Sequence, residues 1–252
     1  MAEVEILVKP PSKRAAREAL EKVREASPQA ILFNLPENVT DLVAELASGM
    51  ISYEEFLEEV RSRLPEPPNA WFKGYEEILT NLYRIVGRSL DVYCYGDPLT
   101  FKIDSEKSLQ LALLTLRSMV TGRIDVNEWL KILRERATVE EAASKREAEK
   151  VAEISTSYEK SICISDSMPS HIRKRLREKG VKLKVHYLGQ PYHFTPIEIL
   201  KRKLAKGDVD EEEVEHLIRE HISFVREYLY RKSLPEAVEE WSMRKLYWIH
   251  RR

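Results

Sequence analysis

The chain has few glycines. There are eight in 252 residues, and neither the dinucleotide-binding pattern GxGxxG nor the P-loop pattern GxxxxGK[ST] occurs. The metal and nucleophile motifs CxxC, HExxH and GxSxG are missing as well. The sequence therefore offers no motif for a nucleotide cofactor, a zinc centre or a serine hydrolase.

Cysteine and labile amides are also scarce. Cys94 and Cys163 each lie within a short apolar run, where a free cysteine behaves as a small buried hydrophobe. We therefore expect a reducing, cytoplasmic location. The chain has three Gln and five Asn against 33% charged residues. This balance is typical of proteins selected at high temperature.

Long apolar runs are absent. No run approaches the length of a membrane-spanning helix, and the N-terminal residues MAEVEILVKPP lack the apolar core of a signal peptide. The sequence thus predicts a soluble protein that does not bind membranes.

Short apolar runs alternate with longer amphipathic ones along most of the chain. The short runs are rich in Val, Ile, Tyr or Cys, and helical stretches separate them, a pattern typical of crossover units around a parallel sheet. We expect strands at residues 4–8, 30–34, 91–95, 161–165 and 182–188. The predicted fold class is therefore α/β, with a mainly parallel sheet of about five strands flanked by helices and a C-terminal helical hairpin.

Several helix starts are marked by a capping residue with a glutamate three positions later. The pairs are Ser52 with Glu55, Asp125 with Glu128, Thr138 with Glu141, Thr195 with Glu198 and Ser233 with Glu236.

The pattern changes after Gly207, because two helical segments follow with no strand between them. We therefore divide the chain into an α/β domain, residues 1–206, and a helical hairpin, residues 207–252. The aromatic residues of the hairpin recur at helical spacing, which indicates packing on the α/β domain or a homodimer through the C-terminal helices. His216 and His221 are five positions apart and point to different faces of a helix, which is poor geometry for a metal site. We expect both at the surface.

In a parallel α/β sheet, ligands bind outside the carboxyl ends of the strands. Polar segments follow the expected strands, and we expect them to line one crevice. The crevice residues are Asn34, Glu37, Asp97, Asp166 and His193. Together with His171, such carboxylates and imidazoles can hold a divalent cation or activate water. Each is equally an ordinary turn, cap or surface residue.

The order of these segments resembles the TraB/ChaN-like superfamily, which includes erythromycin-esterase-like proteins. The runs SPQAILFNLPENVTDLVAEL, LDVYCYGDP, KREAEKVAEI and SICISDSMPSHIRKRLREKGVKLKVHYLG are similar to successive elements of that family, and the resemblance covers residues 3–190. It implies the same fold with an active site at the strand ends. Asp97, Arg146 and Glu147 fit the family pattern, although an Arg–acid pair at a strand end is more often an ion pair than a catalytic unit.

The residues that this family uses for chemistry are missing from the matching positions. Active members carry a His after the first strand, a Glu at the end of the second and a His after a late strand. The corresponding residues here are Pro10 or Pro11, Asn34 and Met168. None of them can act as a general base or bind a hard metal ion at neutral pH. The resemblance therefore implies a divergent member that lacks the catalytic residues.

Charge is unevenly distributed along the chain. Residues 35–66 contain eight acidic and two basic residues, whereas residues 167–206 contain eleven basic and two acidic ones. The two segments either face each other, within the fold or across a dimer, or the basic segment binds nucleic acid. Its cationic and stacking side chains would form an RNA- or DNA-binding surface. They are Arg173, Lys174, Arg175, Arg177, Lys184 and Tyr192.

The sequence thus predicts a non-catalytic ligand-sensing, regulatory or partner-binding protein, with a small ligand or another protein as its partner and with no cofactor or metal. Two alternatives stay open. A nucleic-acid- or ribosome-associated protein would use the basic segment, and a metal-assisted hydrolase would hold a divalent ion through the crevice carboxylates or His193. The spacing of Arg244 and His250 also matches HEPN-type ribonucleases, but such a spacing is common by chance.

Overall fold

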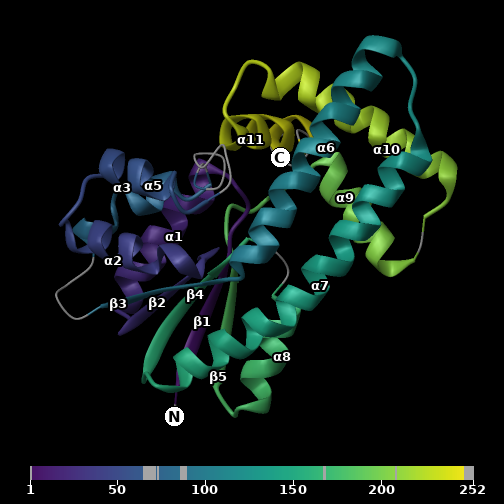
Figure 1. Cartoon of the computed structure of the whole chain (residues 1–252). Helices are drawn as coiled ribbons and strands as arrows, with labels where there is room; N and C mark the ends of the chain where they lie inside the picture. The colour runs from purple at the N-terminus through teal and green to yellow at the C-terminus, as the bar shows by residue number, and fades with distance from the viewer. Residues whose placement is uncertain are drawn as a thin grey trace. The chain divides into compact units, whose positions relative to one another are not determined.

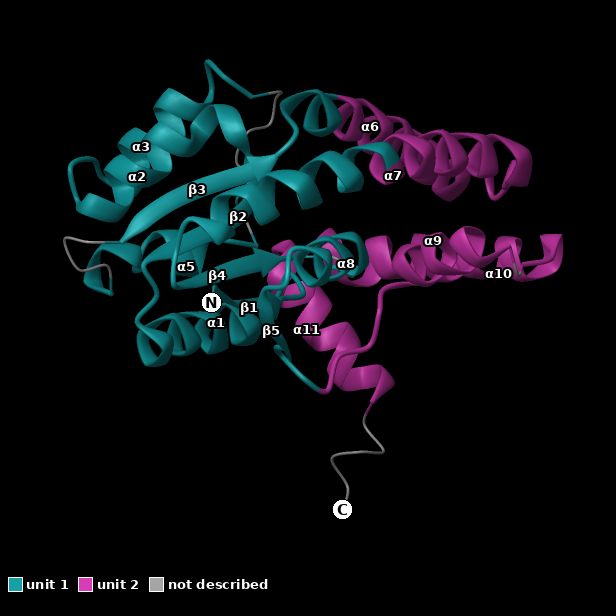
Figure 2. Ribbon diagram, turned by 90° about the horizontal axis from the view of Figure 1, so that it is seen from below, with its two compact units in different colours: residues 1–102, 142–190 teal, residues 103–141, 191–252 magenta. Residues whose placement is uncertain are grey.

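The computed structural model describes residues 2–64, 72, 74–85, 90–166, 169–207 and 209–246. The chain forms two compact units, residues 1–102 with 142–190 and residues 103–141 with 191–252 (Figure 2). The second unit interrupts the first in sequence. Two helices, α6 (Pro98–Thr121) and α7 (Val126–Thr156), therefore contribute residues to both units. This grouping differs from the expected division at residue 206. The expectation that residues 1–206 and 207–252 are two domains stays a prediction.

A five-stranded, all-parallel sheet forms the centre of the first unit (Figure 1). Its strands are β1 (Glu3–Val8), β2 (Ala30–Pro36), β3 (Asp91–Gly96), β4 (Lys160–Ser165) and β5 (Lys182–Tyr187). Their order in the sheet is β3-β2-β4-β1-β5. The predicted α/β class is confirmed. Strands β1, β2 and β4 are buried on both faces, which is why they read as continuous apolar runs.

Helices cover both faces of this sheet. The elements that share a core with one face are α1 (Lys13–Ala26), η1 (Glu37–Val39), α2 (Thr40–Ser48), α3 (Tyr53–Val60), α5 (Glu76–Leu79) and η2 (Leu82–Arg84). Phe33 of β2 and Ile164 of β4 lie in that core. On the other face, α7 and α8 (Ser170–Glu178) pack onto Leu32 and Cys163. Strands β1, β2, β3 and β4 thus contribute alternate side chains to two separate cores, whereas the edge strand β5 contributes to the second core only.

All the regular secondary structure in the described part of the second unit is helical. It contains the greater part of α6 and the first half of α7, followed by α9 (Pro196–Lys206), α10 (Glu211–Phe224), the π-helical turn η3 (Val225–Leu229) and α11 (Leu234–Lys245). The two C-terminal helices form the predicted hairpin, since Phe224 and Trp241 pack with ring centroids 5.4 Å apart. None of the helices in the described part of the chain is both long and apolar enough to cross a membrane.

Most of the predicted helix starts are confirmed. Reciprocal or single capping bonds are present at Ser52 with Glu55, Asp125 with Glu128, Thr195 with Glu198 and Ser233 with Glu236. The predicted start at Thr138 is wrong. Thr138 lies inside α7, where its hydroxyl donates to the Arg134 carbonyl oxygen at 3.0 Å. No Gly or Pro interrupts residues 126–156, so the helix continues past a local capping pattern.

The expected surface position holds for one histidine and only in part for the other, since His221 is partly buried. His216 is exposed, as expected, but His221 packs edge-on against Trp129 with ring centroids 5.7 Å apart. Burial lowers the pKa of His221 to about 4. The five-residue spacing correctly placed the two imidazoles on different faces, but it could not show that one of these faces is the core face.

Candidate functional site

The strands separate at the carboxyl edge of the sheet. The β2–β4 ladder runs only as far as Phe33 beside Ile164, so the next residues, Asn34 and Ser165, lie where it ends. The register of β2 against β3 also shifts between Phe33 and Pro36, which is a β-bulge. Bulges often stand beside binding sites because they redirect a side chain.

A small cavity lies at this point, on the sheet face covered by α7 and α8. It has a volume of about 20 Å³, and we call it the edge pocket. Its lining comes from three strand ends and two helices: Asn34, Tyr95, Ser144, Glu147, Ser165, Pro169, His171 and Ile172. A cavity of this size holds one water molecule or one group of similar size.

Most of the residues that line the edge pocket are polar. Asn34 supplies an amide, Ser144 and Ser165 supply hydroxyls, and Glu147 and His171 supply a carboxylate and an imidazole. These groups together offer hydrogen-bond donors and acceptors to a bound hydroxyl or ammonium group. Their arrangement is suited to recognising one polar group of a ligand.

A second polar cluster lies at the same edge, among residues that pack on the opposite face. We call it the Lys9 cluster: Lys9, Gly74, Tyr75 and Asp166. The Lys9 ammonium donates to the Gly74 carbonyl at 2.8 Å, lies 3.6 Å from Asp166 Oδ1 and sits 4.4 Å from the Tyr75 ring centroid. The Tyr75 hydroxyl donates to Asp166 Oδ1 at 2.8 Å.

Lys9 is completely buried, whereas the Asp166 side chain is 40% exposed. Burial lowers the pKa of Lys9, and the nearby Asp166 carboxylate opposes that shift. A buried cation held by a carbonyl, a carboxylate and an aromatic face fixes the chain segments that carry those groups. The Lys9 cluster therefore ties the ends of β1 and β4 to the segment that begins α5.

Helix α7 is attached to the carboxyl edge by ion pairs. Arg146 Nε donates to Asp97 Oδ2 at 3.0 Å, and Lys150, one turn later, pairs with Glu37. The Glu147 carboxylate accepts the backbone N–H of Asp97 at 3.3 Å. Burial would raise the pKa of Asp97, but Arg146 and two backbone N–H groups hold it below its usual value.

The predicted crevice residues are thus distributed over several places. Asn34 lines the edge pocket, Asp166 belongs to the Lys9 cluster, and Glu37 and Asp97 hold α7. His193 belongs to the second unit. There its backbone N–H donates to the Ser242 hydroxyl at 2.6 Å, and its Nδ1 lies 2.9 Å from the Phe194 carbonyl oxygen.

Sequence reasoning missed Lys9 and Tyr75. A signal existed for the first of them, because Lys9 directly follows an apolar strand and precedes two prolines. Tyr75 carried no such signal, since its partner Asp166 is 91 positions away.

The three positions that the family resemblance marks as lost are only partly described. Asn34 lines the edge pocket, while Pro10 packs near Gly189. Met168 lies outside the described residues. Among the residues that the structure describes, no three His, Cys, Asp or Glu side chains come together in an arrangement that could hold a metal ion.

Several of the predicted nucleic-acid-binding residues are engaged with acidic side chains. Arg175 binds Glu149 with Nη2 and Oε1 2.7 Å apart, and Lys184 lies 2.5 Å from Glu3. Lys184 and Lys182 together lower the pKa of Glu3 to about 2. The observed pairs thus connect the basic segment to β1 and α7. Lys174 and Arg177 are exposed, Arg173 is partly buried, and Tyr192 donates to Glu198 at 2.8 Å in the second unit.

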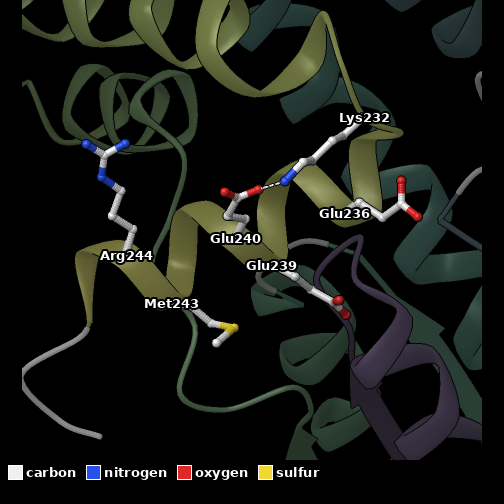
Figure 3. A pocket seen from close by; sticks show the side chains of 6 residues that line it. All are labelled: Lys232, Glu236, Glu239, Glu240, Met243 and Arg244. Atoms are coloured by element: carbon white, nitrogen blue, oxygen red, sulfur yellow. Dashed lines mark hydrogen bonds and ion pairs between the residues drawn. The ribbon is translucent and has the colours of Figure 1, made fainter. Parts of the chain in front are cut away.

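A larger hollow of about 840 Å³ lies along α11 in the second unit (Figure 3). Its lining residues are Lys232, Glu236, Glu239, Glu240, Met243 and Arg244. Lys232 and Glu240 point toward one another and form an ion pair (Figure 3). The hollow is broad and is formed by one helix and by Lys232, two residues before it, so it lacks the converging groups of a ligand site. Arg244 donates to the Tyr228 hydroxyl at 2.9 Å, and His250 lies outside the described residues.

The fold and the edge pocket define the first unit as an all-parallel α/β unit with a polar site at its carboxyl edge. No family model, curated protein or solved structure matches the chain.

Proposed function

We propose that the protein is a non-catalytic ligand-sensing protein, and that its edge pocket receives one polar group of a small ligand. The observation that carries this proposal is the convergence of Asn34, Glu147, Ser165 and His171, from separate elements, at the carboxyl edge of a parallel sheet. Open α/β sheets bind ligands at this edge. The resemblance to TraB/ChaN-like proteins is compatible with the same proposal, because this chain lacks the catalytic residues of that family.

The size of the edge pocket limits the ligand class. About 20 Å³ admits a hydroxyl or an ammonium group but no complete sugar or nucleobase. The mixture of amide, hydroxyl, carboxylate and imidazole favours the same two groups. A polyol or a small amine is therefore the ligand class that we propose.

The ion pairs favour a binding role over an acid–base role. Glu37, Asp97 and Asp166 are each placed beside a cationic side chain, from Lys150, Arg146 and Lys9 respectively. Such pairing engages each of these carboxylates in a structural contact. Two of these pairs attach α7 beside the edge pocket, so a ligand that alters Glu147 or Ser144 acts directly on the helix that carries them.

The experiment is a thermal-shift and NMR titration of the whole chain with glycerol, glucose, ethanolamine and putrescine. We expect at least one probe to raise the Tm of the wild-type protein and to lose this effect in Asn34→Leu and Ser165→Ala. Ser48→Ala is the matched control, because that exposed hydroxyl donates to the Glu45 carbonyl oxygen and does not line the edge pocket. Equal shifts in all variants, or no binding by any probe, would refute the proposal.

The same preparation distinguishes the two alternatives. Stoichiometric divalent metal that is lost in Asp97→Asn would favour a metal-assisted hydrolase. Copurified nucleic acid, seen as a raised A260/A280 ratio and released by salt, would favour an RNA- or DNA-binding protein that uses the basic segment.

A further inference from the structure

A line of exposed apolar side chains runs along α6 within the second unit. Leu109, Leu113, Leu116 and Val120 are 63%, 57%, 49% and 78% exposed. Successive members are four, three and four positions apart, which places them on one face of the helix. We call these four residues the α6 stripe.

The α6 stripe is distinct from the core face of its helix. Leu111 and Leu114, on another side of α6, pack into the core that contains Trp129. Arg117 also binds Glu128 of α7 at 3.1 Å, which helps to hold the helix in place. The stripe is therefore a preformed ridge on an anchored helix. A contiguous set of large exposed apolar side chains of this kind marks a contact surface.

We propose that the α6 stripe binds the same stripe of a second copy of this chain, with the two helices antiparallel. The charges at its ends favour this occupant. Glu106 is exposed one turn before Leu109, and Arg123 is exposed just after the helix. Parallel pairing would place like charges together at each end, whereas antiparallel pairing brings each acidic end to a basic end. It also aligns the helix dipoles favourably.

The spacing is self-complementary in this orientation. When Leu109 faces Val120 of the second copy, Leu113 faces Leu116, so each stripe residue meets an apolar partner. A two-fold axis then relates the copies and closes the assembly as a dimer. The contact is small, so its affinity belongs to the weak, micromolar class of interfaces.

Sedimentation velocity on the whole chain, over a micromolar concentration series, tests the dimer. We expect Leu113→Glu to weaken association by about tenfold or more, because it places a charge in the contact. Met243→Glu is the matched control, since that side chain is 64% exposed on α11. A monomer at every concentration overturns the proposal. So does a dimer that Met243→Glu weakens and Leu113→Glu leaves intact, which is the result expected for pairing through the C-terminal helices.

Disulfide trapping tests the orientation with substitutions that keep the residues small. The double variant Leu109→Cys with Val120→Cys should form a cross-linked dimer under mild oxidation, because the two positions face each other. Leu113→Cys alone should not, since Leu113 faces Leu116 of the second copy, and the Leu113 of that copy lies three positions further along its helix, about 4.5 Å away along the axis. Efficient trapping of Leu113→Cys without trapping of the double variant overturns antiparallel pairing. The native cysteines are buried and do not compete.

Discussion

The Lys9 ammonium lies 3.6 Å from the Asp166 carboxylate, and the two residues directly follow the neighbouring parallel strands β1 and β4. This pair joins two strand ends that are far apart in the sequence. Because Lys9 is completely buried and Asp166 is partly exposed, the two partners are unequal. Removal of the Asp166 carboxylate leaves the buried Lys9 ammonium without its counter-charge. Removal of Lys9 leaves a carboxylate that water can still reach.

Asp166→Asn should lower the free energy of unfolding by about 3 kcal/mol at pH 7, because it removes the charge that faces buried Lys9. The deficit should shrink as the pH rises toward 10. Burial holds the pKa of Lys9 below its unfolded value, so in that range the unfolded state binds more protons and stability rises with pH. Urea unfolding at several pH values measures this. Asp41→Asn, which breaks an exposed pair with Arg63, should cost less than about 1 kcal/mol.

Gly96→Ala should destabilise the first unit by about 2 kcal/mol or more, through overpacking. A Cβ at this position would lie 2.5 Å from Phe101 Cε2 and 2.8 Å from the Leu35 carbonyl oxygen. That carbonyl belongs to the bulged part of β2, so the close approach is part of the edge geometry. Gly74→Ala is the control, since its nearest neighbour would be 3.5 Å away. Equal thermal shifts for the two variants would contradict the steric explanation.

Neither cysteine should react with iodoacetamide in the native protein. Cys94 and Cys163 are buried, and burial raises the pKa of each thiol to about 12, so almost no thiolate is present at pH 8. Mass spectrometry should show labelling of both residues only after unfolding in guanidinium. Rapid native labelling of either thiol would show that its core opens readily.

The second unit should lose stability in mild acid through His221. Its pKa is about 4 in the folded chain and about 6.5 when unfolded. The unfolded state therefore binds more protons between these values, and the contribution of His221 is complete above pH 6.5 and is lost as the pH falls toward 4. Comparison of unfolding free energies with His221→Gln should show a loss on the order of 2 kcal/mol over this range in the wild-type protein only. His216→Gln, at an exposed position, should behave like the wild-type protein.

The strands were predictable because their signal is local. The runs at residues 30–34 and 161–165 are short and mostly apolar, and both are buried on two faces in the structure. Helix starts were predictable where a capping residue stood at the point at which the helical spacing of apolar residues begins. At Thr138 the cap residues were present, but the helical pattern continued through them. Tertiary context decided that case.

The candidate site was less predictable, because it depends on which residues meet. Asn34 was selected as a strand-end residue, and it does line the edge pocket. A lysine directly after a strand is normally exposed, and only the positions of Gly74 and Tyr75 reveal the burial of Lys9. The α6 stripe has heptad spacing, yet spacing alone does not distinguish a core face from an exposed one.

The sequence interruption of the first unit has a practical consequence for dissecting the protein. Residues 103–141 leave and re-enter that unit through the continuous helices α6 and α7. A simple truncation at either terminus therefore cannot isolate the sheet, since β4 and β5 follow residues 103–141 in the sequence. To express the sheet alone, Lys102 must be joined to Ala142 by a linker and the chain must end near Gln190. Ligand binding by this shortened chain would show whether the first unit alone retains the affinity.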